Sequence, residues 1–250
     1  MSAYLETAIL AARQAGEFLR NHFHSEKVVD ETSRYDIKIQ LDKQAQALIG
    51  TVLLGGFPDH ALFGEEGIDG DQSSDYQWIV DPIDGTVNYY YGIPHFCVSI
   101  ALRVRDEIVV GVIYDPMMDE LWSVEKGSPA HRNGVEISVS PREELAEAIV
   151  FVGHGKHDAS MQTGLDRFSR ISSQVRKMRI TGSAALAMAY IATGRFDAYV
   201  ESSISLWDIA AGKLLVEAAG GTVELTPREG EHEKFGIIAS NGKIPIKEQC

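Results

Sequence analysis

The segment Trp78–Thr86, with the sequence WIVDPIDGT, runs from a short apolar strand into two carboxylates. Asp81 and Asp84 stand three positions apart, separated by a proline and an isoleucine and followed by Gly85. Asp, Pro and Gly are typical of the place where a strand ends. Neighbouring carboxylates repel each other unless a proton or a cation lies between them, and a hard divalent cation suits oxygen ligands. The segment therefore indicates a cation site, with a simple acidic turn as the alternative.

The length and composition are those of a globular protein with a sizeable core. The 250 residues suffice for one large domain or two coupled halves, and 44% of them are hydrophobic and 24% charged. The net charge of −13 argues against a general nucleic-acid or anionic-membrane surface, because both require a basic footprint.

The cysteines and the N-terminal segment indicate the cellular compartment in which the protein is expected. Cys97 lies in an apolar run and Cys250 is the last residue, so neither a metal spacing nor a disulfide framework is visible. The N-terminal segment lacks the basic cluster of a secretory signal, and Glu6 interrupts its apolar stretch. Apolar runs are too short to cross a bilayer. We expect a cytoplasmic protein.

Periodicity and turn residues predict a mixture of helices and strands. Apolar spacing predicts helices at 3–20, 41–54, 159–172, 183–193 and 207–219. Extended runs predict strands at 60–63, 77–80, 97–104, 108–114, 120–124, 149–152 and 196–201. Residues 105–107 and 133–134 have the composition of tight turns. The order indicates an α+β or layered α/β protein, with halves at 1–142 and 143–250 that form one unit.

Acidic residues recur where these predicted elements begin or end. Glu65 and Glu66 follow the strand at 60–63, Asp208 lies at the start of the helix at 207–219, and Asp42 lies at the start of the helix at 41–54. Taken singly, Glu65 and Glu66 fit turn positions, and Asp42 and Asp208 fit helix caps.

Together these motifs resemble the inositol monophosphatase family of metal-dependent, lithium-sensitive sugar phosphatases. The main matches are Gly64–Glu66, Asp81–Tyr89 and Trp207–Gly212, with support from Asp36–Asp42, Gly182–Ala185 and Asp197–Glu201. They occur in the family's order over nearly the whole chain. The resemblance implies the family's layered α/β/α/β/α sandwich, a homodimer, two or three Mg²⁺ ions in the active site, and inhibition by Li⁺.

The resemblance also assigns roles to the matched positions. It implies metal ligands at Glu65, Asp81, the carbonyl of Ile83, Asp84 and Asp208, with a water-mediated metal contact from Glu66. It implies that Asp42 and Thr86 orient and deprotonate the attacking water. The substrate contacts that it implies are Asp84, Gly85, Thr86, Gly182, Ser183, Ala184, Glu201 and Asp208.

Elementary chemistry agrees with these roles. A phosphate monoester carries close to two negative charges, so metal ions held by carboxylates would neutralise it and acidify a bound water. The Thr86 hydroxyl can accept a hydrogen bond from water while donating to Asp42. Gly85 lacks a side chain, which lets the backbone approach a phosphate. A helix beginning at Thr86 or Val87 would add a favourable dipole.

The segment Val152–Asp158 does not align residue by residue with the family. It resembles a phosphate loop but lacks the Gly-Lys-Ser/Thr ending. It is either a polar surface loop or a segment in which Lys156 or His157 contacts the substrate. His95 follows Pro94 in an apolar stretch, which favours packing over metal binding, and the spacing of histidines and cysteines does not indicate zinc.

We therefore expect a Mg²⁺-dependent phosphatase of a small polyol phosphate, in the first place myo-inositol monophosphate, acting by direct attack of water without a phosphoenzyme. The alternatives within this chemistry are fructose 1,6-bisphosphate, histidinol phosphate and 3′-phosphoadenosine phosphates. The alternative of another class is a regulatory, partner-binding protein with residual catalysis. Every matched metal position is intact, which favours an enzyme.

Overall fold

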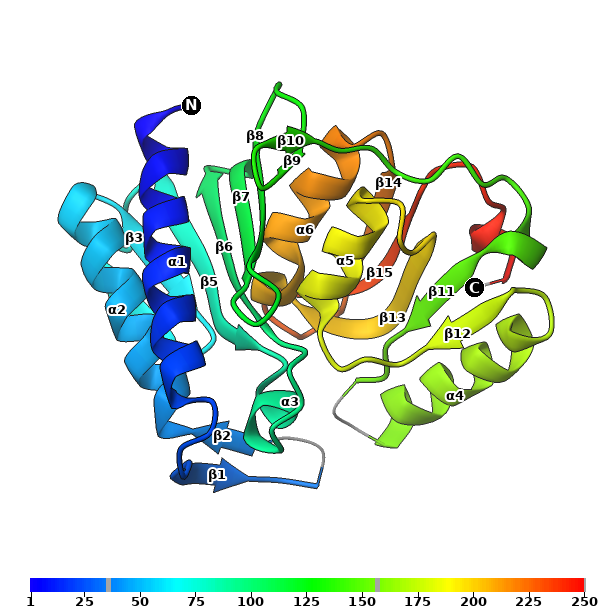
Figure 1. The fold of residues 1–250 in the computed structure, drawn as a ribbon, viewed down its shortest axis with the longest axis horizontal. Helices are drawn as coiled ribbons and strands as arrows, with labels where there is room; N and C mark the ends of the chain where they lie inside the picture. The colour runs from blue at the N-terminus through cyan, green and yellow to red at the C-terminus, as the bar shows by residue number, and fades with distance from the viewer. Residues whose placement is uncertain (35–36, 156–157, 250) are drawn as a thin grey trace.

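The computed structural model describes residues 1–34, 37–155 and 158–249 (Figure 1). Asp36, Lys156, His157 and Cys250, which the sequence analysis singled out, lie outside the described residues. Two β-sheets alternate with layers of helices. Helices α1 and α2 cover one face of the larger sheet, α5 and α6 lie between the two sheets, and α4 lies outside the smaller sheet (Figure 1). The layered α/β fold predicted from the sequence is thereby confirmed.

The larger sheet has eight strands in the order β10-β9-β8-β7-β6-β5-β3-β4, with β3 parallel to β5 and the other neighbours antiparallel. Its strands are β3 (Ala61–Gly64), β4 (Gly67–Gly70), β5 (Tyr76–Asp84), β6 (Cys97–Val104), β7 (Glu107–Asp115), β8 (Glu120–Glu125), β9 (His131–Arg132) and β10 (Val135–Glu136). The helices on its outer face are α1 (Ala3–His22) and α2 (Gln40–Gly56). The predicted turns at 105–107 and 133–134 connect β6 to β7 and β9 to β10.

The smaller sheet has five strands in the order β12-β11-β13-β15-β14, and mixes parallel and antiparallel pairs. Its strands are β11 (Ile149–Val152), β12 (Lys177–Arg179), β13 (Ala198–Ser205), β14 (Thr222–Pro227) and β15 (Lys234–Ser240). The flanking helices are α4 (Asp158–Ser172), α5 (Ala184–Ala192) and α6 (Leu206–Ala218). Strands β12, β14 and β15 were not predicted, although the alternation of Val223 and Leu225 with polar neighbours is typical of a half-buried strand.

Shorter elements complete the chain. Strands β1 (Val29–Thr32) and β2 (Ile37–Ile39) pair with each other, and α3 (Thr86–Tyr90) is a single helical turn. Two 3₁₀ turns lie at Leu145–Glu147 and Ile246–Gln249. In the part of the chain that the structure describes, no helix is both long and apolar enough to span a membrane.

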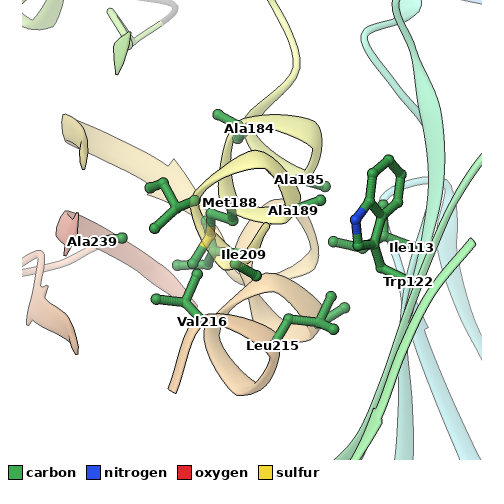
Figure 2. Packing of buried hydrophobic residues seen from close by; sticks show 14 of the residues in the cluster. Ile113, Trp122, Ala184, Ala185, Met188, Ala189, Ile209, Leu215, Val216 and Ala239 are labelled. Carbon is green, nitrogen blue, oxygen red and sulfur yellow. The ribbon is translucent and has the colours of Figure 1, made fainter. Parts of the chain in front are cut away.

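The core joins the two sheets through helices α5 and α6. Alanines make up most of α5, and their small side chains allow close packing against α6, where a Cβ on Gly212 would lie 2.6 Å from the Cβ of Met188. Trp122 of β8 packs against one side of this helix pair and Ala239 of β15 lies on the other (Figure 2). One hydrophobic cluster therefore contains residues of both predicted halves.

Strand β5 differs from the prediction at its functionally important end. The sequence indicated a strand that stops at Val80, whereas β5 continues through Asp84. The pairing of β5 with β6 shifts in register between Asp81 and Asp84. Pro82 has no N–H to give to a ladder, and the N–H of Ile83 donates to Asp81 Oδ1 at 2.9 Å instead. The two carboxylates therefore lie on a bulged strand rather than in a turn beyond it.

Candidate active site

A cavity of about 450 Å³ lies where the bulged end of β5 meets the first turns of α3, α5 and α6. Every site residue predicted from the sequence except Asp42 and Glu66 lines it, namely Glu65, Asp81, Ile83, Asp84, Gly85, Thr86, Gly182, Ser183, Ala184, Glu201 and Asp208. These residues come from segments more than a hundred positions apart, so the fold brings together most of the predicted set.

Three carboxylates form a cage inside this cavity. Asp81, Asp84 and Asp208 each offer one oxygen, and the three oxygens lie within 4.8 Å of one another. Asp81 is 1% exposed and Asp84 is 6% exposed. Burial raises the pKa of Asp81, and the charges of Glu65, Asp84 and Asp208 raise it further. Two buried carboxylates and a half-buried one this close together fit a bound divalent cation, which removes the repulsion among them.

Asp84 is fixed by the N-terminus of α5. Its Oδ2 accepts hydrogen bonds from the Ser183 hydroxyl and the Ala185 N–H, both at 2.6 Å, and its Oδ1 accepts from the Ala184 N–H at 3.3 Å. Burial raises the pKa of Asp84, whereas these donors act in the opposite direction. Ser183 and Ala184 were predicted as substrate contacts, and the structure gives them this additional task of holding a carboxylate of the cage.

Asp42 lies beside the cavity and contacts Thr86. The Thr86 hydroxyl lies 2.9 Å from the Ile83 carbonyl oxygen and 3.4 Å from Asp42 Oδ1. The other oxygen of Asp42, Oδ2, accepts from the Ile39 N–H at 2.9 Å and so caps α2. Burial, together with the nearby Glu65 and Glu66, raises the pKa of Asp42 to about 8.

Asp208 is likewise both a cap and a cage residue. It lies in the first turn of α6, where its Oδ2 accepts from the Ser205 N–H at 3.1 Å. The capping interpretation that the sequence suggested for Asp208 is therefore correct, and it coexists with the position of this carboxylate in the cage.

Gly85 adopts a conformation that other residues rarely reach. Its φ is +102°, and a Cβ there would lie 3.0 Å from the His95 carbonyl oxygen and 3.3 Å from that of Gly182. Helix α3 begins at the next residue, Thr86, as predicted. This sharp turn places the first turn of α3 at the cavity wall.

The remaining glutamates occupy distinct surroundings. Glu65 lines the cavity and its N–H donates to the Val80 carbonyl at 3.1 Å, which ties the β3–β4 turn to β5. Glu66 is paired with Lys38 at 3.1 Å, and its side chain is 4% exposed. Glu201 accepts from the Tyr199 hydroxyl at 2.6 Å.

Several lining residues were not assigned to the site by the sequence analysis, although it left a substrate contact in the segment 152–158 open. His154 and Gly155, in the loop after β11, line the cavity, as do Trp207 and Lys234. Cys97 lies next to the cage, with its Sγ 3.8 Å from Asp84 Oδ2. Cys97 carried no usable signal in the sequence, because its proximity follows from the pairing of β5 with β6.

Comparison with known proteins agrees with this geometry. The sequence model of the inositol monophosphatase family matches residues 1–248. The chain belongs to the inositol monophosphatase family. The metal dependence of this family accords with the acidic cage.

Individual relatives are similar over nearly their full length. The protein named Nus factor SuhB from Pseudomonas aeruginosa is 37% identical, over 97% of this chain and 93% of the relative. Inositol monophosphatase 2 from Solanum lycopersicum is also 37% identical, over 98% and 96% of the two chains. The crystal structure of the extragenic suppressor protein suhB from Bartonella henselae superimposes with a TM-score of 0.90 at 36% identity, covering 99% of this chain and 97% of the other.

Proposed function

We propose that this protein is a Mg²⁺-dependent phosphomonoester hydrolase that acts on a small polyol phosphate, with myo-inositol monophosphate as the first candidate. The observation that carries the proposal is the cage of the buried Asp81 and Asp84 and the half-buried Asp208 within one cavity that also contains Thr86. The relative from Solanum lycopersicum named inositol monophosphatase 2 supports the choice of substrate.

We assign two tasks to the groups in and beside the cavity: holding the metal ions and activating the attacking water. Asp81, Asp84 and Asp208, with Glu65 and the Ile83 carbonyl, would hold the metal ions. Bound Mg²⁺ supplies positive charge that neutralises the phosphate and acidifies water. Thr86 and Asp42 would orient the attacking water, and Asp42 would accept its proton in the ionised form that nearby bound cations favour.

Other groups that line the cavity suit a hydroxylated ring. Glu201 offers a carboxylate and Gly182 and Ala184 offer backbone groups, while the N–H groups of Gly85 and Thr86 would contact the phosphate. A cavity of about 450 Å³ has room for a single polyol ring with its phosphate.

Replacement of the cage carboxylates tests the proposal. Asp84→Asn and Asp208→Asn each remove one charge while keeping the shape of the side chain, so phosphate release should fall at least about a hundredfold. Asp166→Asn changes an exposed carboxylate of α4 and serves as the control, with unchanged release. Phosphate release from myo-inositol monophosphate would be measured with Mg²⁺, and circular dichroism would verify folding. Full activity of folded Asp84→Asn would contradict the metal assignment.

The same assay separates the alternative substrates. Fructose 1,6-bisphosphate, histidinol phosphate and 3′-phosphoadenosine 5′-phosphate would be compared with myo-inositol monophosphate, each with and without Li⁺. The largest kcat/KM identifies the preferred ester, and inhibition by Li⁺ is expected for all that react. Light scattering would test the expected homodimer.

A second candidate function rests on the names of relatives. Proteins from Pseudomonas aeruginosa and Escherichia coli that are 36–37% identical are named Nus factor SuhB rather than after an enzymatic activity. This favours a partner-binding role beside catalysis or in place of it. Absence of turnover on the whole panel, with Mg²⁺ bound, would favour the binding role alone.

A further inference from the structure

The carboxylate of Glu201 is held in place by two neighbours that have no role in the proposed function. Glu201 belongs to β13, lines the active-site cavity and is 7% exposed. Tyr199 lies two positions earlier on the same strand, and side chains two positions apart point to the same face of a sheet. The Tyr199 hydroxyl donates to Glu201 Oε2 at 2.6 Å. This hydrogen bond fixes one oxygen of the carboxylate.

Tyr199 itself has little freedom to move. Its side chain is fully buried, and its ring packs edge-on against Phe151 of β11, with the two ring centroids 4.9 Å apart. Burial raises the pKa of Tyr199, and the charges of Glu201, Asp208 and Asp84 raise it further, so the hydroxyl keeps its proton. A hydroxyl that donates in this way favours the ionised form of Glu201, which only accepts hydrogen bonds.

Gly153 provides the space that this carboxylate occupies. It follows β11 directly, and its N–H donates to the Val200 carbonyl at 3.0 Å, which places its backbone beside β13. A Cβ at Gly153 would lie 1.7 Å from Glu201 Oε2 and 2.5 Å from its Cδ, far inside van der Waals contact. The φ of Gly153 is not positive, so the close approach rather than the backbone conformation requires glycine here.

We propose that Tyr199 and Gly153 are positioning residues for Glu201, and that they make the site selective for esters whose alcohol carries a free hydroxyl. This role rests on the proposed function, in which Glu201 contacts the hydroxylated ring. An acceptor that is already fixed loses little side-chain freedom when a hydroxyl binds to it. An alcohol without a hydroxyl would cover the carboxylate without offering it a hydrogen bond, which costs free energy.

Comparison of two esters tests this selectivity. We would measure kcat/KM with Mg²⁺ for myo-inositol monophosphate and for 4-nitrophenyl phosphate, whose alcohol has no further hydroxyl. Tyr199→Phe removes only the donor, so kcat/KM for the inositol ester should fall at least about tenfold, mainly through a higher KM. The value for 4-nitrophenyl phosphate should change by less than about twofold, because that ester does not use the fixed acceptor.

Gly153→Ala reaches the same result by a different route. The added Cβ displaces the Glu201 carboxylate directly, so the preference for the inositol ester should fall as it does in Tyr199→Phe. In a Glu201→Ala background neither substitution should lower the preference further, because both act through that carboxylate. Further losses in that background would contradict the positioning role.

Tyr114→Phe is the matched control. It removes the hydroxyl of another buried tyrosine, which donates to Asp119 Oδ1 at 3.0 Å and is not among the residues that line the cavity. This variant should keep the ester preference of the unchanged protein. Circular dichroism would verify that every variant is folded.

The outcomes separate the positioning role from the proposed function. Absence of turnover of both esters by the unchanged protein would contradict the proposed function. Turnover of both, with the same preference in folded Tyr199→Phe and Gly153→Ala, would overturn the positioning role alone. Crystal structures of the two variants give a readout without turnover, in which the Glu201 carboxylate should leave its observed place. An unmoved carboxylate in both structures would overturn the role whatever the protein hydrolyses.

Discussion

At the scale of single residues, Asp42 and Asp208 each cap a helix and also lie at or beside the candidate site. Each lies in the first turn of its helix and accepts a hydrogen bond from the backbone N–H of the N-cap residue, Asp42 from Ile39 and Asp208 from Ser205. A cap fixes the rotamer of the carboxylate, so the same bond that stabilises the helix also aims the side chain. The choice between cap and site residue, which the isolated motifs left open, is therefore not exclusive.

The pair of Thr86 and Asp42 leads to a prediction about turnover. Thr86→Ala removes the hydroxyl that lies between the Ile83 carbonyl and Asp42, so kcat should fall by about 10²–10⁴-fold with little change in KM. Thr86→Ser restores the hydroxyl and should recover most of the activity. Steady-state kinetics on myo-inositol monophosphate would measure both variants. A Thr86→Ala enzyme with unchanged kcat would show that the hydroxyl has no part in the reaction.

The raised pKa of Asp42 predicts an unusual pH dependence of stability in the metal-free protein. Asp42 has a pKa of about 8 in the folded state and so keeps its proton up to about that pH, whereas the pKa of an unperturbed aspartate is about 3.9. Between these two values the folded state binds more protons than the unfolded state, so stability falls as pH rises. Thermal unfolding in EDTA should show a Tm that decreases from pH 5 to pH 8.

Asp42→Asn is the control for this pH dependence, because it keeps an acceptor for the Ile39 N–H but does not titrate. The decrease in Tm between pH 5 and pH 8 should therefore be smaller in this variant. Each kcal/mol of unfolding free energy that no longer depends on pH corresponds to about 2–4 °C in Tm. Saturating Mg²⁺ should also reduce the decrease by stabilising the ionised carboxylates. A Tm that rises with pH equally in both proteins would contradict the assignment.

At the scale of elements, the N-terminus of α5 and the bulge of β5 form one structural unit. The bulge turns Asp84 toward α5, and three groups of that helix terminus donate to the carboxylate. The Ser183 hydroxyl has two tasks, because it also accepts from the Leu186 N–H at 3.3 Å and thereby caps the helix. The orientation of a cage residue thus depends on the start of a helix a hundred positions away.

Ser183→Ala should therefore affect both stability and catalysis. Loss of the cap should lower the free energy of unfolding by about 1 kcal/mol. Asp84 would also lose the hydrogen bond from the Ser183 hydroxyl, so Mg²⁺ should bind about 10- to 100-fold more weakly. Weaker binding would be measured as a higher Mg²⁺ concentration at the half-maximal rate. Ser2→Ala removes a similar cap from α1, where Ser2 Oγ accepts from the Leu5 N–H, far from the site. It should cost similar stability with no change in Mg²⁺ dependence, and equal behaviour of the two variants would refute the coupling.

At the scale of the whole molecule, the two predicted halves share one core. Trp122 from the first half and Tyr199 from the second belong to the same hydrophobic cluster around α5 and α6. The cage is divided in the same way, with Asp81 and Asp84 from the first half and Asp208 from the second. Each half also has a hydrophobic cluster of its own, but neither the cluster around α5 and α6 nor the cage is complete in either half.

Unfolding should consequently occur as a single transition. Tryptophan fluorescence reports mainly on residues 78 and 122 of the first half and residue 207 of the second, whereas far-UV circular dichroism reports on all elements. Both signals should change with the same midpoint in urea. Residues 1–142 produced alone should not fold, because helices α5 and α6 would be missing from the core. Separate midpoints, or a folded N-terminal fragment, would establish two independent domains.

The sequence allowed prediction of the elements with strong periodicity and of the residue types of the site. Helices α1, α2, α5 and α6 were predicted nearly in full, because their apolar spacing is regular. Strands such as β12, with three residues, and β14, largely exposed, were missed because little burial distinguishes them from loops. The bulge in β5 was missed because a register shift depends on the partner strand.

The sequence by itself determined which side chains are available: carboxylates at the starts of helices and beside a proline in a strand, and a glycine before Thr86. Motif order was enough to indicate the family, because these local patterns carry over directly from chain to structure. Only the tertiary structure decided that Asp81, Asp84 and Asp208 converge within 4.8 Å and that α5 aims Asp84. The reason is that convergence depends on strand register and helix packing, which are set by contacts between residues distant in the chain.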